Sequence, residues 1–214
     1  MALIFFDFDG VLVDSLAADT EEFKAACHSV GVDCIKSCDD MSRLSEGNFY
    51  QGLMDMGVPR EKVSAVLDTY AKRIQDPDFH LDAHRPMMKL VKKLAKKYPL
   101  YIVTSNLSFM AESILEENGV KHVEDVLGAD KEISKIKKFQ KIKELYPGEK
   151  SVFVSDTKGD MLEAAEAGID VRIGVTWGWQ KPWVVASGEP DYLFCDFSAL
   201  KAWFKGFLAG DKII

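Results

Sequence analysis

Short apolar runs recur along the chain, and polar residues follow each of them before a segment with helical spacing begins. The runs are residues 3–6, 100–103, 151–154, 171–175 and 192–194. Their β-branched and aromatic residues are typical of buried strands. Strands that alternate with helices in this way form a parallel sheet with helices on both faces, which predicts a three-layer α/β fold. Ligands bind such sheets at the carboxyl ends of the strands, where the polar residues lie.

One long segment interrupts this alternation. Residues 16–84 contain no run typical of a buried strand, and their apolar residues follow helical spacing on both sides of a polar stretch at 37–52. The two helical patterns consist of Phe23, Ala26, Cys27 and Val30, and of Val63, Val66, Leu67, Tyr70 and Ile74. We therefore predict an α-helical cap domain, residues 16–84, inserted after the first strand of a core domain that comprises residues 1–15 and 85–214.

The composition narrows the possible partners. Hydrophobic residues make up 47% and charged residues 29% of the chain, as in ordinary globular proteins. No apolar run approaches the roughly 20 residues needed to span a bilayer, and residues 1–6 lack the basic start of a signal peptide. A net charge of −7 argues against nucleic acid, whose backbone binds basic surfaces. We therefore expect a cytoplasmic protein with neither a membrane nor a nucleic-acid partner; no pattern specifies an oligomeric state.

Cysteine and histidine pairs raise the alternative of a zinc site. Cys34 and Cys38 are four positions apart, as are His80 and His84. The stretch between the two pairs is far longer than in compact zinc modules, and helical patterns lie within it. Disulfides are uncommon in a chain of this kind without a secretion signal. We therefore interpret the cysteines as free thiols and the histidines as surface or inter-domain residues.

The end of the first predicted strand carries the most informative local pattern, Phe6-Asp7-Phe8-Asp9-Gly10. Two carboxylates two positions apart cannot both be hidden in the core, and in the turn after a strand they lie close enough to share a cation. Gly10 allows the chain to turn sharply. An acidic turn without a function is an equally acceptable interpretation of this segment alone.

The run at residues 151–154 ends in the same way, with Ser155 and Asp156, and Asp160 then opens a helix. A helix N-cap would explain Asp160 but not Asp156. Carboxylates at two strand ends of one sheet predict a site for a hard cation, most simply Mg²⁺.

A third strand end supplies hydroxyl groups. Thr104, Ser105 and Asn106 follow the run at residues 100–103 and lead into a helix. Side-chain hydroxyls and backbone N–H groups before a helix are suited to bind phosphate oxygens.

In this order the segments resemble the motifs of the haloacid dehalogenase-like (HAD) hydrolase superfamily, in the subgroup with a helical cap after the first strand. The sequence is similar to the phosphoglycolate phosphatase and β-phosphoglucomutase branch over nearly the whole chain. The resemblance implies a Rossmann-like core, a nucleophile at Asp7, an acid/base at Asp9 and the hydroxyl of the second motif at Thr104. Asp9 favours phosphate-ester chemistry, since the resemblance implies that dehalogenases, which expel a halide, lack this residue.

The lysine of the third family motif has two candidates. The resemblance places it at Lys135, where Ile136 replaces the proline that often follows, and Lys131 is the alternative. In the fourth motif Ser155 stands where the family usually has glycine. This departure leaves both carboxylates of that motif in place.

The resemblance implies a Mg²⁺-dependent phosphatase that hydrolyses a small phosphorylated metabolite through an aspartyl-phosphate. The implied catalytic residues are Asp7, Asp9, Thr104 and Lys135. The implied phosphate-binding residues are Thr104, Ser105, Asn106 and Lys135, and the implied metal-binding residues are Asp7, Asp9, Asp156 and Asp160. Two alternatives stay open: a phosphosugar mutase that uses the same motifs, and a catalytically silent binding module with this fold.

The predicted cap would set the choice of substrate by closing over the site. Arg43, in the polar stretch, is the candidate contact for an anionic group, and a solvated loop is the alternative interpretation. Trp177, Trp179 and Trp183 follow a strand end, and they either line the rim of the site or pack against the core.

Overall fold

A parallel sheet forms the centre of the molecule. The computed structural model describes residues 2–76 and 78–209. Six strands lie in the order β5-β4-β1-β6-β7-β8, and every pairing between them is parallel. The strands are β1 (Ala2–Phe6), β4 (Leu100–Val103), β5 (Asp125–Leu127), β6 (Lys150–Ser155), β7 (Val171–Val175) and β8 (Tyr192–Phe194). The predicted α/β fold class is confirmed.

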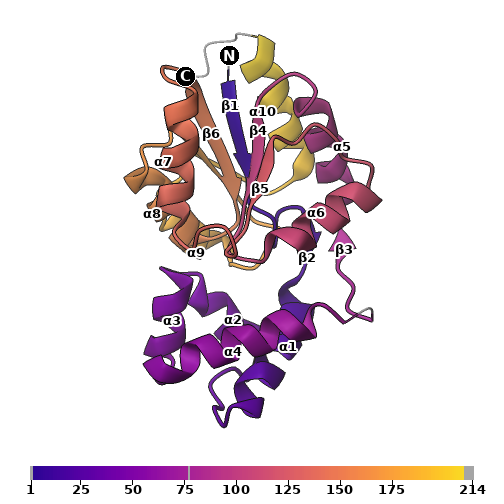
Figure 1. The fold of residues 1–214 in the computed structure, drawn as a ribbon. Helices are drawn as coiled ribbons and strands as arrows, with labels where there is room; N and C mark the ends of the chain where they lie inside the picture. The colour runs from indigo at the N-terminus through magenta and orange to yellow at the C-terminus, as the bar shows by residue number, and fades with distance from the viewer. Residues whose placement is uncertain (1, 77, 210–214) are drawn as a thin grey trace.

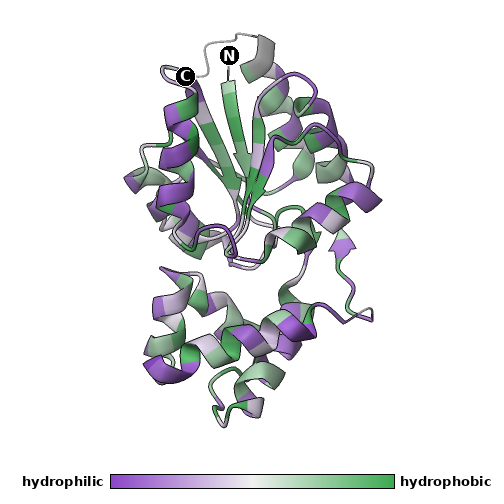
Figure 2. Ribbon diagram, viewed as in Figure 1, coloured by the Kyte–Doolittle hydropathy of each residue, from purple (hydrophilic) through white to green (hydrophobic). Residues whose placement is uncertain are grey.

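Helices cover both faces of this sheet, which gives the three predicted layers (Figure 1). The core helices are α5 (Arg85–Leu94), α6 (Ser108–Glu117), α7 (Lys135–Leu145), α8 (Lys158–Glu166), α9 (Pro182–Ala186) and α10 (Phe197–Ala209). Ile4 and Phe6 of β1 are buried with residues of α5, α6 and α10. Leu3 and Phe5 point to the opposite face and are buried with residues of α7 and α8. Because both faces of β1 are buried, the strand is an uninterrupted apolar run, and the central strands are mostly green in Figure 2.

Four helices between β2 and β3 form a separate layer below the carboxyl ends of the strands (Figure 1). They are α1 (Leu16–Ser29), α2 (Cys38–Leu44), α3 (Phe49–Asp55) and α4 (Arg60–Arg73). Their apolar residues, among them Phe23, Leu53 and Val66, pack in a cluster of their own. The predicted domain boundaries at residues 15–16 and 84–85 stay a prediction; the helices lie within them.

The two connections to these helices lie side by side. β2 (Val13–Asp14) and β3 (Asp82–Ala83) form a short antiparallel pair in which Val13 lies opposite Ala83. The backbone N–H of His84 also donates to Leu12 O at 2.8 Å. This pairing holds the ends of the helical insertion together at one point beside the core.

Several elements differ from the sequence prediction. The stretch at 37–52 contains α2 and α3, whose N-caps Ser37 and Asn48 each accept a hydrogen bond from a backbone N–H. The interpretation of this stretch as a solvated loop is therefore wrong. β5, an edge strand of three residues, was not predicted. Within the described part of the chain, no helix has both the length and the apolar character needed to cross a membrane.

Candidate active site

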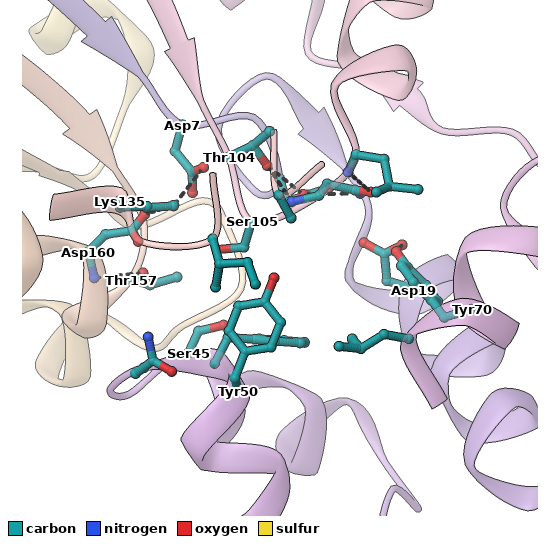
Figure 3. Close-up of a pocket in the computed structure, with 18 of the residues that line it drawn as sticks. Asp7, Asp19, Ser45, Tyr50, Tyr70, Thr104, Ser105, Lys135, Thr157 and Asp160 are labelled. Carbon is teal, nitrogen blue, oxygen red and sulfur yellow. Dashed lines mark hydrogen bonds and ion pairs between the residues drawn. The ribbon is translucent and has the colours of Figure 1, made fainter. Parts of the chain in front are cut away.

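The candidate site is a cavity of about 260 Å³ between the carboxyl ends of the strands and the helices α1 to α4. Asp7 follows β1 and Thr104 follows β4, and both line the cavity. Lys135 and Asp160, from the first turns of α7 and α8, lie beside Asp7 (Figure 3). The structure therefore brings together residues from four separate predicted segments.

Asp7 is fixed by hydrogen bonds on both carboxylate oxygens. Its Oδ1 accepts from Lys135 Nζ at 3.0 Å, and its Oδ2 accepts from Ser155 Oγ at 3.3 Å. The side chain is almost fully buried. Burial raises the pKa of the Asp7 carboxyl well above its usual range, although the charge of Lys135 acts in the opposite direction. A second positive charge here would favour the carboxylate form that can act as a nucleophile.

Lys135 is a buried cation held between two carboxylates. Its Nζ lies 2.7 Å from Asp160 Oδ2 and 3.0 Å from Asp7 Oδ1. Burial by itself lowers the pKa of this amine, but the charges of Asp160 and Asp7 outweigh that effect and raise it above its usual value. Lys131, the alternative motif lysine, instead pairs with Glu112 and Asp125 away from Asp7.

Asp160 orients this lysine, and it does not cap α8. The N-cap is Thr157, whose hydroxyl accepts from the backbone N–H of Asp160 at 3.3 Å. The N-cap explanation of Asp160 is therefore wrong, because the helix begins three residues earlier than expected. Asp160 Oδ2 accepts from Lys135 and lies 2.5 Å from Ser155 Oγ, whose single proton is shared between Asp160 and the more distant Asp7 Oδ2. Ser155, at the position where the family usually has glycine, thus links Asp7 to Asp160.

The two carboxylate oxygens of Asp156 have different surroundings. Within the described residues, its Oδ1 is buried without a hydrogen-bond partner, while its Oδ2 accepts from Trp179 N at 2.5 Å. Burial raises the pKa of Asp156 to about 7. A Cβ at Gly10 or Gly178 would lie 2.1 Å from Asp156 Oδ2, so glycine is required at both positions for this close approach.

These features fit a bound cation. Asp7 and Asp156 follow strands that pair side by side, and Oδ1 of Asp156 has no hydrogen-bond partner among the described residues. A hard divalent cation would supply the missing contact and offset the repulsion between the buried carboxylates. Among the described residues, no group of three His, Cys, Asp or Glu side chains is already arranged around one metal position. Water and backbone carbonyls would have to complete such a site, as is usual for Mg²⁺.

Asp9 contacts the segment that follows β4. Its Oδ2 accepts from Asn106 Nδ2 at 3.3 Å and from Thr104 Oγ1 at 3.4 Å. Its Oδ1 is buried without a hydrogen-bond partner in the part of the chain that the structure describes. Burial raises the pKa of the Asp9 carboxyl, and hydrogen bonds from Ser15 and Asn106 act against this rise. A raised pKa is suited to a group that donates a proton near neutral pH.

A buried lysine that the sequence analysis missed binds the backbone of the segment after β4. Lys138 is buried, and its Nζ donates to Thr104 O at 2.7 Å. Burial, reinforced by the charge of Lys135, lowers the pKa of Lys138 to about 8. The signal that could have found it is the spacing of three positions from Lys135, which places both lysines on one side of α7.

The tryptophans that follow β7 have different positions. Trp179 lines the cavity, and its Nε1 donates to Ser15 Oγ at 3.1 Å. Trp177 stacks on His84 with ring centroids 5.7 Å apart, whereas the side chain of Trp183 is 67% exposed. Arg43 is exposed and pairs with Asp40 at 4.0 Å, so it does not line the cavity as expected of an anion contact.

The cysteine and histidine pairs lie apart from the cavity. Cys34 Sγ contacts Cys27 Sγ at 3.7 Å, and Cys38 is exposed at the start of α2. His84 caps α5, because its Nδ1 accepts from Met87 N at 3.3 Å. Cys34 therefore packs against α1, and His84 caps α5.

Comparisons with known proteins identify the family of the chain. The model of a family described as haloacid dehalogenase-like hydrolase matches residues 4–173. A phosphoglycolate phosphatase from Pasteurella multocida (strain Pm70) is 30% identical over 116 residues, which cover 49% of this chain and 49% of that protein. The match to this curated relative therefore spans about half of its length.

Solved structures share the fold. A predicted phosphatase from Clostridium acetobutylicum superposes with a TM-score of 0.81 at 17% identity, covering 95% of this chain and 97% of that one. A haloacid dehalogenase-like hydrolase from Streptococcus pneumoniae superposes with a TM-score of 0.78 at 22% identity, covering 95% of this chain and 98% of that one. A predicted phosphoglycolate phosphatase from Haemophilus somnus 129pt superposes with a TM-score of 0.75 at 22% identity, covering 95% of this chain and 98% of that one. At these identities the likeness shows the fold alone.

Proposed function

Because the chain belongs to the haloacid dehalogenase-like hydrolase family, as the motifs predicted, we propose that it is a phosphatase that uses Mg²⁺ and hydrolyses small phosphate monoesters. The observation that carries this proposal is the contact of Asp7, at the end of β1, with Lys135, in a cavity that Asp9 also lines. Asp9 Oδ1 has no hydrogen-bond partner among the described residues. A nucleophile, a buried cation and an acid/base in one cavity are the groups that phosphoryl transfer through an enzyme carboxylate requires.

Binding of the ester depends on positive charge and hydrogen-bond donors. Lys135, Thr104, Ser105 and Asn106 line the cavity and are assigned to the phosphoryl oxygens. We assign Asp7, Asp156 and the backbone carbonyl of Asp9 to a Mg²⁺ ion, which would offset the charge of the dianionic ester when bound. Asp160 is assigned mainly to orienting Lys135, because that contact and Ser155 occupy its Oδ2.

The reaction then follows from the positions of two carboxylates. A carboxylate oxygen of Asp7 attacks phosphorus, the bond to the ester oxygen breaks, and Asp9 gives its proton to the departing alkoxide. Asp9, now ionised, takes a proton from a water molecule that attacks the aspartyl-phosphate at phosphorus. Inorganic phosphate leaves and the Asp7 carboxylate is restored. The raised pKa of Asp9, caused first by burial, supports its role as the acid of the first step.

Release of inorganic phosphate tests the proposal. The full-length protein is incubated with Mg²⁺ and a panel of phosphate monoesters that includes an aryl phosphate, and Asp7→Asn serves as the inactive control. We expect phosphate release by the wild type and a fall of about 10³-fold or more in the variant. Equal, slow release by both proteins would contradict the proposal and favour a binding module without catalysis.

A further inference from the structure

The end of the cavity formed by α1 and α4 contains a buried carboxylate that the proposed chemistry does not use. Asp19 of α1 is 1% exposed, and its Oδ1 accepts from Tyr70 Oη of α4 at 2.6 Å. Both residues line the cavity. Figure 3 shows them side by side, at the end of the cavity away from Lys135 and Asp160. This is the end that the alcohol part of an ester would occupy when its phosphate lies at Asp7.

Asp19 is close to the proposed acid/base. Burial raises the pKa of Asp19 well above its usual range, and the charge of Asp9 raises it further. Ser15 Oγ accepts a hydrogen bond from Trp179 Nε1 at 3.1 Å, and Ser15 lies close enough to both carboxyls to lower the pKa of each. The two carboxyls therefore face the same small volume, in which a hydrogen-bond donor is favoured and a further negative charge is not.

The rest of this wall adds acidic and apolar groups. Asp68 also lines the cavity, together with the rings of Phe23 and Phe49, whereas Glu163 lines it near Asp160 and Lys135. Of the described residues that line it, the only lysine or arginine is Lys135, which is already paired with Asp7 and Asp160. A carboxylate on the alcohol part of a substrate would thus lie against Asp19 and Asp9 without a free cation beside it, which costs free energy.

We propose that Asp19 and Tyr70 form a leaving-group subsite that accepts an alcohol with a hydrogen-bond donor, a hydroxyl or an ammonium group, and that rejects a carboxylate. This inference rests on the proposed phosphatase function and specifies its substrate class. It separates the chain from its curated relative, which is named for phosphoglycolate, an ester whose alcohol part carries a carboxylate. The donor of the substrate would bind Asp19 while the phosphate lies at Asp7 and Lys135.

A matched series of short esters tests this subsite. Ethyl phosphate, 2-hydroxyethyl phosphate, 2-aminoethyl phosphate and phosphoglycolate differ mainly in the group at the far end of the alcohol. With the wild-type protein and Mg²⁺, we expect kcat/KM for the hydroxyl or the ammonium ester to exceed that for ethyl phosphate by about tenfold, and phosphoglycolate to fall about tenfold below it. The inference is overturned if phosphoglycolate is hydrolysed as well as ethyl phosphate or better.

The variant Asp19→Asn keeps the size of the side chain and removes its ability to form a carboxylate beside the substrate. We expect the ratio of kcat/KM for 2-aminoethyl phosphate to that for phosphoglycolate to fall by about tenfold or more. Using a ratio cancels any general effect on Asp9. Asp33→Asn, which changes an exposed carboxylate outside the cavity, is the matched control and should leave the ratio unchanged. An unchanged ratio in Asp19→Asn would overturn the inference.

The outcomes also separate this inference from the function on which it rests. If the wild type hydrolyses ethyl phosphate or an aryl phosphate but prefers phosphoglycolate, the subsite is wrong and the phosphatase stands. If neither these esters nor any other member of the series releases phosphate above the level of Asp7→Asn, the phosphatase and the subsite are both wrong.

Discussion

The ammonium group of Lys135 lies 3.0 Å from Asp7 Oδ1, although 128 residues separate the two along the chain. The contact depends on the parallel order of the sheet, which places the end of β1 beside the segments that precede α7 and α8. A buried cation between two carboxylates holds the proposed nucleophile in one orientation and supplies charge for the phosphoryl group.

Replacing this lysine should affect activity and stability together. Lys135→Met leaves Asp7 and Asp160 buried without their cation, so we expect kcat on an aryl phosphate to fall by about 10²–10³-fold. Breaking a buried ion pair also costs about 3–5 kcal/mol in the free energy of unfolding, measured by urea denaturation.

Lys131→Met is the matched control, since Lys131 pairs at the surface with Glu112 and Asp125. Its effect on unfolding should stay within about 1 kcal/mol, and kcat should not change. Equal effects of the two substitutions would show that Lys135 has no special role.

Magnesium should stabilise the protein through Asp156. In EDTA, Asp156→Asn should be at least as stable as the wild type, because it removes a buried carboxylate whose Oδ1 has no partner among the described residues. With Mg²⁺ at about 100 times its Kd, the wild type should gain about 2.7 kcal/mol in the free energy of unfolding. The variant should gain little. Calorimetric melting with and without Mg²⁺ measures the stabilisation of the wild type and of the variant. Equal stabilisation of the two proteins would exclude Asp156 as a ligand.

The loop between α2 and α3 contacts α8 so closely that a methyl group at Gly159 should push the two apart. A Cβ at Gly159 would lie 2.5 Å from Gly47 O and 2.7 Å from Ser45 O. Alanine normally stabilises a helix relative to glycine, but Gly159→Ala should lower kcat/KM by about tenfold or more because the cavity cannot close. Gly47→Ala, whose Cβ meets nothing within 4 Å, is the comparison. Wild-type kinetics in Gly159→Ala would show that this contact is not needed for turnover.

The thiol of Cys27 should be inert in the folded protein. Burial, followed by the neighbouring Cys34, raises the pKa of Cys27 to about 12. The thiolate is the reactive form, so iodoacetamide at about pH 8 should modify the exposed Cys38 and Cys195 first. Mass spectrometry of the peptides gives the order. Modification of Cys27 at the same rate as Cys38 would mean that α1 opens readily.

The sequence predicted the groups that depend on local pattern. Asp7, Thr104 and Asp156 are predicted because each lies just beyond an apolar run, and the carboxyl ends of parallel strands meet at one edge. Lys135 could be proposed only from the family resemblance, since its burial depends on the packing of α7 against the sheet. The N-cap of α8 was misplaced because Thr157 and Asp160 are both suitable caps and only the backbone geometry distinguishes them.

Other features could not be predicted because they are long-range. The hydrogen bond from Tyr70 to Asp19 joins residues 51 positions apart on two helices. The pattern of each helix does not indicate that the two helices pack against each other at these residues. The pair of β2 and β3 consists of two-residue strands without a pattern of their own. Such contacts follow from how the helices α1 to α4 pack together, which periodicity alone does not specify.

The proposed phosphorylation of Asp7 is tested most directly by trapping the acyl phosphate. The protein is mixed with an aryl phosphate and Mg²⁺, quenched in acid during turnover and reduced with borohydride, which converts an acyl phosphate to the alcohol. Tandem mass spectrometry of the N-terminal peptide should then show homoserine at position 7 in the wild type, and none when substrate is omitted. Continued release of phosphate without any modification of Asp7, or modification at another carboxylate, would contradict its role as the nucleophile.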